Sequence, residues 1–184
     1  RSILPQGLHK SDGFFIARLR RLDESAEIVL LERGEYVSFA NCGLPYYIGG
    51  VIPDQDDLTL QTPERFHARF RIDVRTLHEA VSIDPQRKTV AVRDIRRDCV
   101  YEESYDSLVL SPGAEPIRPK IDGIDSPAVF SLRNIPDTLK IKAYIESEKP
   151  VSAVVVGGGY IGVEMAENLK RRGWTYPLSN CPTT

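Results

Sequence analysis

A Gly-x-Gly-x-x-Gly pattern, Gly157 to Gly162, directly follows the short apolar run Val154-Val155-Val156. The residues from Tyr160 onward have the pattern of an amphipathic helix, which is expected to end at Gly173. Glycine lets the backbone approach a pyrophosphate, and the free N–H groups at a helix N-terminus attract its negative charge. The strand before the pattern and the helix after it favour a dinucleotide-binding turn over a plain tight turn.

The composition is that of an ordinary globular protein. The 184 residues are 41% hydrophobic and 27% charged, with a formal net charge of −2. This balance predicts neither a nucleic-acid partner nor a membrane partner, and we expect the short arginine-rich stretches at 18–21 and 93–97 to be solvated. Cys42, Cys99 and Cys181 lack metal-site spacing. They suggest a reducing, cytoplasmic environment rather than a disulfide framework.

A second nucleotide-binding signal lies near the N-terminus. The run Glu27-Ile28-Val29-Leu30-Leu31-Glu32 is typical of a buried parallel strand that ends in an acid. Such a carboxylate can accept hydrogen bonds from both ribose hydroxyls, so Glu32 is a candidate ribose ligand, although a lone strand-terminal acid is more often a surface residue. A strand with its own glycine pattern should precede this run. Residues 1–15 show no clear period and no such pattern, so we assign no element there.

The rest of the chain predicts an α/β fold built from fragments of two Rossmann-like nucleotide-binding domains with an antiparallel β insertion. A helix should begin at Thr62-Pro63, and mostly antiparallel strands should follow between Thr76 and Leu110. A crossing rich in proline and glycine divides the predicted domains, 1–118 and 119–184. A polar helix is expected at about 135–148 and a strand at 151–156. Residues 174–180 do not have the pattern of a parallel strand, although one is due there.

Cys42 precedes Gly43-Leu44-Pro45-Tyr46-Tyr47, a segment that can begin a helix. A helix dipole stabilises a nearby thiolate by about 0.3–1 kcal/mol, whereas one pKa unit corresponds to ~1.4 kcal/mol. The dipole alone would therefore lower the pKa of the thiol, about 8.5 in a free cysteine, by less than one unit. Full ionisation at neutral pH needs a second stabiliser, such as a flavin ring. Cys42 has no partner at dithiol spacing. It would therefore act alone, through a mixed disulfide or a sulfenic acid, unless it is a buried and inert cysteine.

The segment 38–50 (Ser-Phe-Ala-Asn-Cys-Gly-Leu-Pro-Tyr-Tyr-Ile-Gly-Gly) resembles the active-site box of the coenzyme A-disulfide reductases and their relatives. These relatives are the NADH oxidases, NADH peroxidases and persulfide reductases, within the pyridine nucleotide-disulfide oxidoreductases. The likeness continues through 28–33, 105–114 and 154–172 and covers roughly Ala17 to Gly173. The cysteine box is specific to the branch with a single redox cysteine.

The resemblance implies an FAD-dependent NAD(P)H:disulfide oxidoreductase in which Cys42 is the redox nucleophile and alternates between a thiolate and a disulfide with coenzyme A. Hydride would pass from NAD(P)H to FAD, and electrons would then reduce the Cys42 disulfide. Domain 1–118 would bind FAD through Glu32, Arg33, Val81, Ser111, Pro112 and Gly113. Domain 119–184 would bind NAD(P)H through Gly157, Gly158, Gly159, Tyr160, Ile161, Gly162 and Glu164, with Tyr160 gating the nicotinamide. Coenzyme A, or another small thiol or disulfide, would meet Ser38, Asn41, Arg18 and Arg21.

The sequence departs from the family at both ends, so we expect a truncated and inactive form of an enzyme whose intact relatives are homodimers. The first glycine motif, the C-terminal FAD segment and the dimerisation domain are missing. Residues 174–181 can be encoded by a DNA stretch whose shifted frame reads Met-Asp-Val-Ser-Leu-Val-Glu-Leu, a hydrophobic strand that ends in an acid. Our hypothesis is therefore that this tail is a frameshift product. The choice between NADH and NADPH stays open. An NADH oxidase or peroxidase with a Cys42 sulfenic acid, and a non-catalytic nucleotide-binding remnant, are the alternatives.

Overall fold

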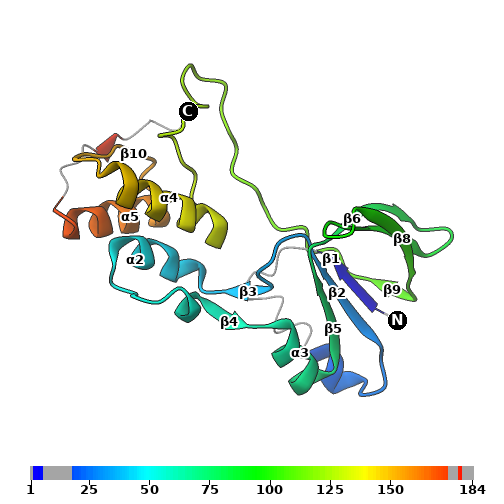
Figure 1. Ribbon diagram of the computed structural model, residues 1–184. Helices are drawn as coiled ribbons and strands as arrows, with labels where there is room; N and C mark the ends of the chain where they lie inside the picture. Colours follow the sequence, from blue (N-terminus) through cyan, green and yellow to red (C-terminus); the bar gives the residue numbers. More distant parts are fainter. Residues whose placement is uncertain (1, 6–17, 174–177, 180–184) are drawn as a thin grey trace. The chain divides into compact units, whose positions relative to one another are not determined.

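The computed structural model describes residues 2–5, 18–173 and 178–179 (Figure 1). The chain divides into two compact units, Arg1–Ser38 with Gln61–Ala114, and Phe39–Leu60 with Glu115–Thr184. We call them the first and the second unit. The chain crosses between them within β3 (Ser38–Phe39) and again within β4 (Thr59–Gln61), which pair as a two-stranded sheet. The segment around Cys42 therefore belongs to the same compact unit as the glycine turn.

The first unit contains a four-stranded parallel sheet with the order β5-β2-β1-β9. Its strands are β5 (Ile72–Thr76), β2 (Ile28–Glu32), β1 (Ser2–Pro5) and β9 (Ser107–Leu108). The expectation of no element at Ser2–Pro5 is wrong, since β1 lies there. Strand β9 falls within the run 76–110 that was predicted to be mostly antiparallel, and it is the parallel strand of that run. Strand β1 is too short for a periodic pattern to be seen, and its pairing with β2 and β9 defines it.

Strand β2 is buried on both faces, as expected for a central strand of a parallel sheet. On one face, Ile28 and Leu30 pack with Phe66 of α3 (Pro63–Phe70) and with Leu19 of the helical residues 18–22. On the other face, Val29 and Leu31 pack against the antiparallel sheet through Val90 and Val92. The first unit thus has three layers, which are helices, a parallel sheet and an antiparallel sheet.

The antiparallel sheet contains β6 (His78–Asp84), β7 (Thr89–Asp94) and β8 (Cys99–Ser104) in that order. The predicted antiparallel insertion is therefore confirmed, and with it the α/β fold class. The register of β6 on β7 shifts between Ala80 and Ser82, so Val81 is the extra residue of a β-bulge.

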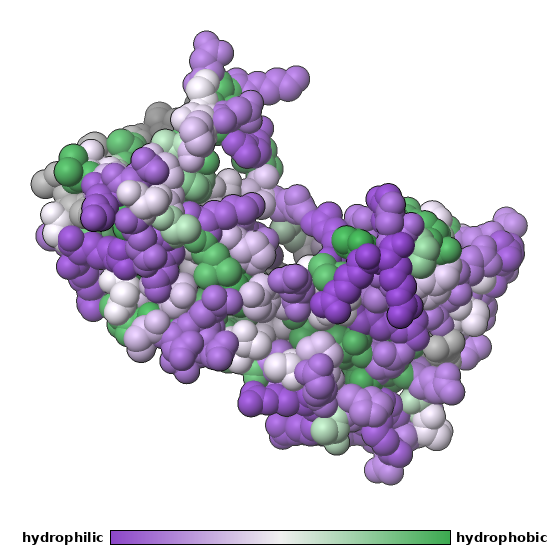
Figure 2. Space-filling view, viewed as in Figure 1, coloured by the Kyte–Doolittle hydropathy of each residue, from purple (hydrophilic) through white to green (hydrophobic). Residues whose placement is uncertain are grey.

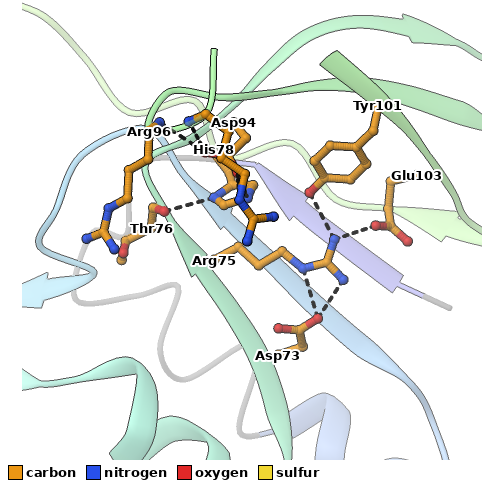
Figure 3. Close-up of polar contacts among 9 residues, drawn as sticks. Asp73, Arg75, Thr76, His78, Asp94, Arg96, Tyr101 and Glu103 are labelled. Carbon is orange, nitrogen blue, oxygen red and sulfur yellow. Dashed lines mark hydrogen bonds and ion pairs between the residues drawn. The ribbon is translucent and has the colours of Figure 1, made fainter. Parts of the chain in front are cut away.

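A polar cluster joins the parallel sheet to the antiparallel one (Figure 3). Arg75 of β5 donates hydrogen bonds to Asp73 at 2.6 and 2.9 Å, to the Tyr101 hydroxyl at 2.9 Å and to the buried carboxylate of Glu103 on β8. Burial by itself lowers the pKa of Arg75. The hydrogen bonds raise the pKa by more than burial lowers it, so the pKa of Arg75 lies above its ordinary value. Arg75 is a permanently charged bridge between the two sheets.

Arg20 is buried, so the prediction that the arginines at 18–21 are all solvated is wrong at this position. Its guanidinium donates to the carbonyl oxygens of Asp23, Glu24 and Ala26, and to those of Phe70 and Arg71 at the end of α3. The five bonds are 2.7–3.3 Å long. Arg20 therefore ties the turn before β2 to the C-terminus of α3.

The second unit is built around two helices that were predicted correctly, α4 (Ile135–Glu148) and α5 (Tyr160–Arg171). The shorter α2 (Leu44–Gly49) packs on both of them. The buried cluster between the three helices contains Ile48, Ile141, Ile145, Met165 and Leu169.

The predicted strand at 151–156 is reduced to β10 (Val155–Val156). Strand β10 pairs in parallel with β11 (Leu178–Ser179), so the prediction that residues 174–180 contain no parallel strand is wrong at these two positions. Residues 174–177 lie outside the described part of the chain. The strand due after the second glycine turn is thus present over two residues.

Hydrophilic side chains cover most of the face shown in Figure 2. Among the described residues, no helix has both the length and the apolar character needed to span a bilayer. Exposed apolar side chains gather where β10 leads into α5, at Val154, Val156, Tyr160, Ile161 and Val163.

Candidate functional site

The three glycines of the motif, Gly157, Gly159 and Gly162, lie in three different surroundings. Gly157 has φ of +110°, a conformation that side chains rarely adopt. A Cβ on Gly162 would overlap the carbonyl oxygen of Gly157, so only glycine lets the first turn of α5 pack this closely on the strand end. A Cβ on Gly159 would meet nothing within 4 Å, so this position is open to an approaching ligand. This division of roles is the one that a pyrophosphate-binding turn needs.

The N-terminus of α5 also suits an anionic ligand. Its N-cap, Gly159, provides no side-chain hydrogen bond, and the first turn contains no acidic residue. The N-cap and first turn of α5 therefore provide no side chain that compensates the positive end of the helix dipole. Gly158, Tyr160 and Ile161 are exposed at this turn, and Glu164 is half-buried one turn later. The predicted NAD(P)H residues from Gly157 to Gly162 thus lie on one accessible turn, and Glu164 follows one helical turn later.

Cys42 lies in the 3₁₀ turn η1 (Asn41–Gly43), which continues directly into α2. The prediction that it lies at the start of a helical segment is confirmed. Its side chain is exposed, so the alternative of a buried cysteine is excluded. A Cβ on Gly43 would lie 3.1 Å from Leu58 and 3.2 Å from Ile52, which fixes the turn closely against its surroundings. The Oδ1 atom of Asn41 is buried without a hydrogen-bond partner among the described residues.

The predicted FAD residues lie in the first unit. Glu32 ends β2 and accepts a hydrogen bond from the Gly34 N–H at 2.7 Å, which holds its carboxylate at the strand end. Arg33 forms a 3.9 Å ion pair with Glu79 of β6. The bulge at Val81 takes one peptide out of the β6–β7 register, which suits a residue predicted to contact a ligand through its backbone.

The strand order places β1 between β2 and β9, where a doubly wound sheet changes direction and where nucleotides bind in such sheets. Ser111, Pro112 and Gly113 follow β9, and Gly113 has φ of +71°, which favours glycine. The glycine motif that the sequence analysis found missing would follow β1, and that position lies outside the described residues.

The predicted coenzyme A residues are divided between the units. Arg18 and Arg21 are exposed in the first unit, whereas Asn41 belongs to the second unit together with Cys42. Ser38 is half-buried in β3, at the crossing. Of the four predicted residues, only Asn41 shares a unit with Cys42, and the coenzyme A roles stay predictions.

The sequence did not reveal the residues that pack against α2, the helix that follows Cys42. The Lys142 ammonium of α4 lies 3.6 Å from the centre of the Tyr47 ring, and Asn168 of α5 contacts Gly49. A polar residue on the apolar face formed by Met165, Ala166 and Leu169 was the available signal for Asn168.

Comparison with known proteins identifies the family of this chain. Residues 15–178 match the family described as pyridine nucleotide-disulphide oxidoreductase. The chain is 43% identical over 168 residues to coenzyme A disulfide reductase from Staphylococcus epidermidis, across 89% of this chain and 38% of the relative. This chain therefore spans less than half the length of that relative.

Two solved structures are similar to this one. The reduced CoADR-RHD of Bacillus anthracis has a TM-score of 0.92 and 52% identity, over 97% of this chain and 32% of that chain. The water-forming NADH oxidase of Lactobacillus brevis bound to NADH has a TM-score of 0.84 and 34% identity, over 96% of this chain and 38% of that chain. Both similarities confirm the predicted fold class and the predicted family. The chain belongs to the pyridine nucleotide-disulphide oxidoreductases, a family of FAD- and NAD(P)H-dependent enzymes.

Proposed function

We propose that this chain provides the redox cysteine and the dinucleotide turn of an NAD(P)H:disulfide oxidoreductase that acts on coenzyme A disulfide or a related small disulfide. The observation that supports this function most directly is the location of Cys42. Its side chain is exposed at the start of a helical segment, in the same compact unit as the glycine turn. A thiol that attacks a disulfide must be accessible, and a buried cysteine would not serve.

The residues fit the cofactors that the family uses. Gly157 allows the tight turn, Gly159 leaves space for the ligand, and Gly162 allows α5 to pack closely on the strand end. A turn that binds a dinucleotide pyrophosphate requires these three properties. For FAD, the ligands would be Glu32 at the end of its strand, the Val81 bulge and residues 111–113. When bound, NAD(P)H and FAD supply the two electrons that disulfide reduction consumes.

The part played by the chain itself is thiol–disulfide exchange at Cys42. Its thiolate attacks one sulfur of the substrate disulfide, so that a Cys42 mixed disulfide forms and the first thiolate leaves. Two electrons and one proton then cleave the mixed disulfide, which releases the second thiol and restores the Cys42 thiolate. The start of the helical segment favours the thiolate through its N–H groups and dipole by about 0.3–1 kcal/mol. Asn41 lies next to the sulfur in sequence and would orient the substrate.

A second function is favoured by the similarity to an NADH oxidase at 34% identity. In that case Cys42 would alternate between thiolate and sulfenic acid, with peroxide or oxygen as the oxidant. The same exposed side chain serves both reactions, so only the adduct formed on the sulfur separates them.

Mass spectrometry of the full chain tests the proposal without requiring turnover. After incubation with coenzyme A disulfide, we expect a coenzyme A adduct on Cys42 in preference to Cys99, which is also exposed but lies on β8 of the first unit. The Cys42→Ser variant should lose that adduct. If Cys42 forms only a dimedone-trapped sulfenic acid after peroxide treatment, the oxidase or peroxidase function is favoured instead. Modification of Cys42 and Cys99 at equal rates by both reagents would contradict a dedicated redox role.

A further inference from the structure

The helix that follows Cys42 and the helix that begins at the glycine turn touch at Gly49 and Asn168. A Cβ placed on Gly49 would lie 2.5 Å from Asn168 Oδ1 and 2.7 Å from Asn168 Cβ. Non-bonded carbon atoms pack at about 3.5–4.0 Å, so there is no room for a side chain at position 49. The backbone of α2 therefore rests directly on the Asn168 side chain.

Asn168 is fully buried, and its hydrogen bonding is unusual for a buried amide. Its Nδ2 donates to the Glu164 carbonyl at 2.8 Å, one turn earlier in α5. Its Oδ1, which faces Gly49, is buried with no hydrogen-bond partner among the described residues. A leucine has the same number of side-chain heavy atoms, branched at the same carbon, and would leave no buried oxygen unpaired. What the asparagine adds is a side chain that its own helix holds in one orientation, and so a spacer of fixed height.

The surrounding contacts also hold α2 against α4 and α5. Ile48 is completely buried against Met165 and Leu169 of α5 and against Ile141 of α4. Tyr47, beside it, is held under Lys142. The height of the spacer consequently sets the separation of α2 from α5. Because Cys42 immediately precedes α2, and the glycine turn immediately precedes α5, that separation also sets where the sulfur lies relative to the turn.

We propose that Asn168 is a positioning residue for the redox centre. Wedged against Gly49, it holds α2 at one distance from α5 and so fixes Cys42 relative to the dinucleotide turn. The significance of that placement rests on the proposed function, whereas the contact itself lies wholly within the second unit. The contact between Gly49 and Asn168 thus connects the helix after Cys42 with the helix after the glycine turn.

The test is the rate at which iodoacetamide alkylates Cys42 in the full chain, measured by peptide mass spectrometry with Cys99 as internal reference. Gly49→Ala should move α2 and change the Cys42 rate about threefold or more, as is common for residues in contact. Asn168→Ala removes the amide of the spacer and should also change the Cys42 rate. Glu167→Ala is the matched control, because Glu167 is exposed on α5 and only pairs with Arg171.

The exchanged pair, Gly49→Ala with Asn168→Gly, gives back the space that the methyl group takes and should return the Cys42 rate toward that of the wild type. An unchanged Cys42 rate in both single variants would overturn the proposal. So would an equal change at Cys99, which indicates general loosening, or a failure of the exchanged pair to restore the rate. Nucleotide fluorescence on the wild-type chain tests the proposed function separately. If NADH does not bind, the proposed function fails, while the alkylation rates still decide the role of Asn168.

Discussion

The carbonyl oxygen of Gly157 occupies the space in which a side chain on Gly162 would begin. The two residues are the first and last glycines of the turn, and their contact brings the start of α5 onto the end of β10. A side chain on Gly159 would make no such contact. Gly162 is therefore needed for the fold, whereas Gly159 is needed only for ligand binding.

Gly162→Ala should therefore lower both the stability of the second unit and its affinity for NADH, since the methyl group must push α5 away from the strand. Gly159→Ala should leave the unfolding transition nearly unchanged, because alanine in place of an N-cap glycine costs only a modest amount, ~1 kcal/mol or less. It should nevertheless weaken NADH binding about tenfold or more, by placing a methyl group where the pyrophosphate approaches. Nucleotide fluorescence and thermal unfolding check both variants. Normal NADH binding by Gly159→Ala would contradict the assignment of the turn.

Arg20→Met should destabilise the first unit by about 2–4 kcal/mol, because it leaves several partly buried carbonyl oxygens without their donor. Arg21→Met is the matched control, since Arg21 is the exposed neighbour, and its effect should stay within about 0.5 kcal/mol. Urea unfolding measures both. Equal effects of the two substitutions would show that Arg20 is not the tie between α3 and the turn before β2.

Glu103→Ala should cost about 2 kcal/mol or more, because it removes a buried partner from Arg75 and leaves the guanidinium with Asp73 and Tyr101. Glu102→Ala removes an exposed ion pair with Arg87 one residue away, and should cost less than about 1 kcal/mol. The comparison is made by denaturant unfolding at neutral pH. If Glu102→Ala proved the more harmful of the two, the cluster in Figure 3 would not be what joins the sheets.

The stability of the first unit should depend on the charge of Asp94. Burial raises the pKa of this carboxyl, but hydrogen bonds from the Arg97 and Arg96 N–H groups, and the nearby His78 and Arg97, lower it overall. A carboxyl with a lowered folded-state pKa stabilises the fold above its unfolded pKa, and this contribution is lost as the pH falls through the folded value. We therefore expect stability to decline below about pH 4.

The decline should be shallower in Asp94→Asn, which carries no charge to lose. Thermal unfolding between pH 2 and about pH 7 measures the slope. Asp98→Asn serves as the control, because Asp98 is exposed and forms a surface pair with Arg93. Identical acid slopes for wild type and Asp94→Asn would refute this role of Asp94.

The sequence alone determined the parts of the site whose chemistry is local. Three glycines at fixed spacing between an apolar run and a helix define the turn at 157–162, since backbone conformation there depends on the absence of a side chain. The start of a helical segment at Cys42, the Thr62 cap of α3 and the bounds of α4 follow from neighbours within one or two turns. The buried run of β2 was likewise visible, because four successive apolar residues need cover on both faces.

The tertiary structure alone decided what depends on partners distant in sequence. The strand β1 is defined by its pairing with β2 and β9, and Arg20 is buried by carbonyls fifty residues away at the end of α3. The assignment of residues 39–60 to the second unit comes from the packing of α2 on α4 and α5. A sequence pattern records which face of an element is apolar, but not which other element covers it. For this reason the closeness of Gly49 to Asn168, on which the placement of Cys42 depends, is visible only in the folded chain.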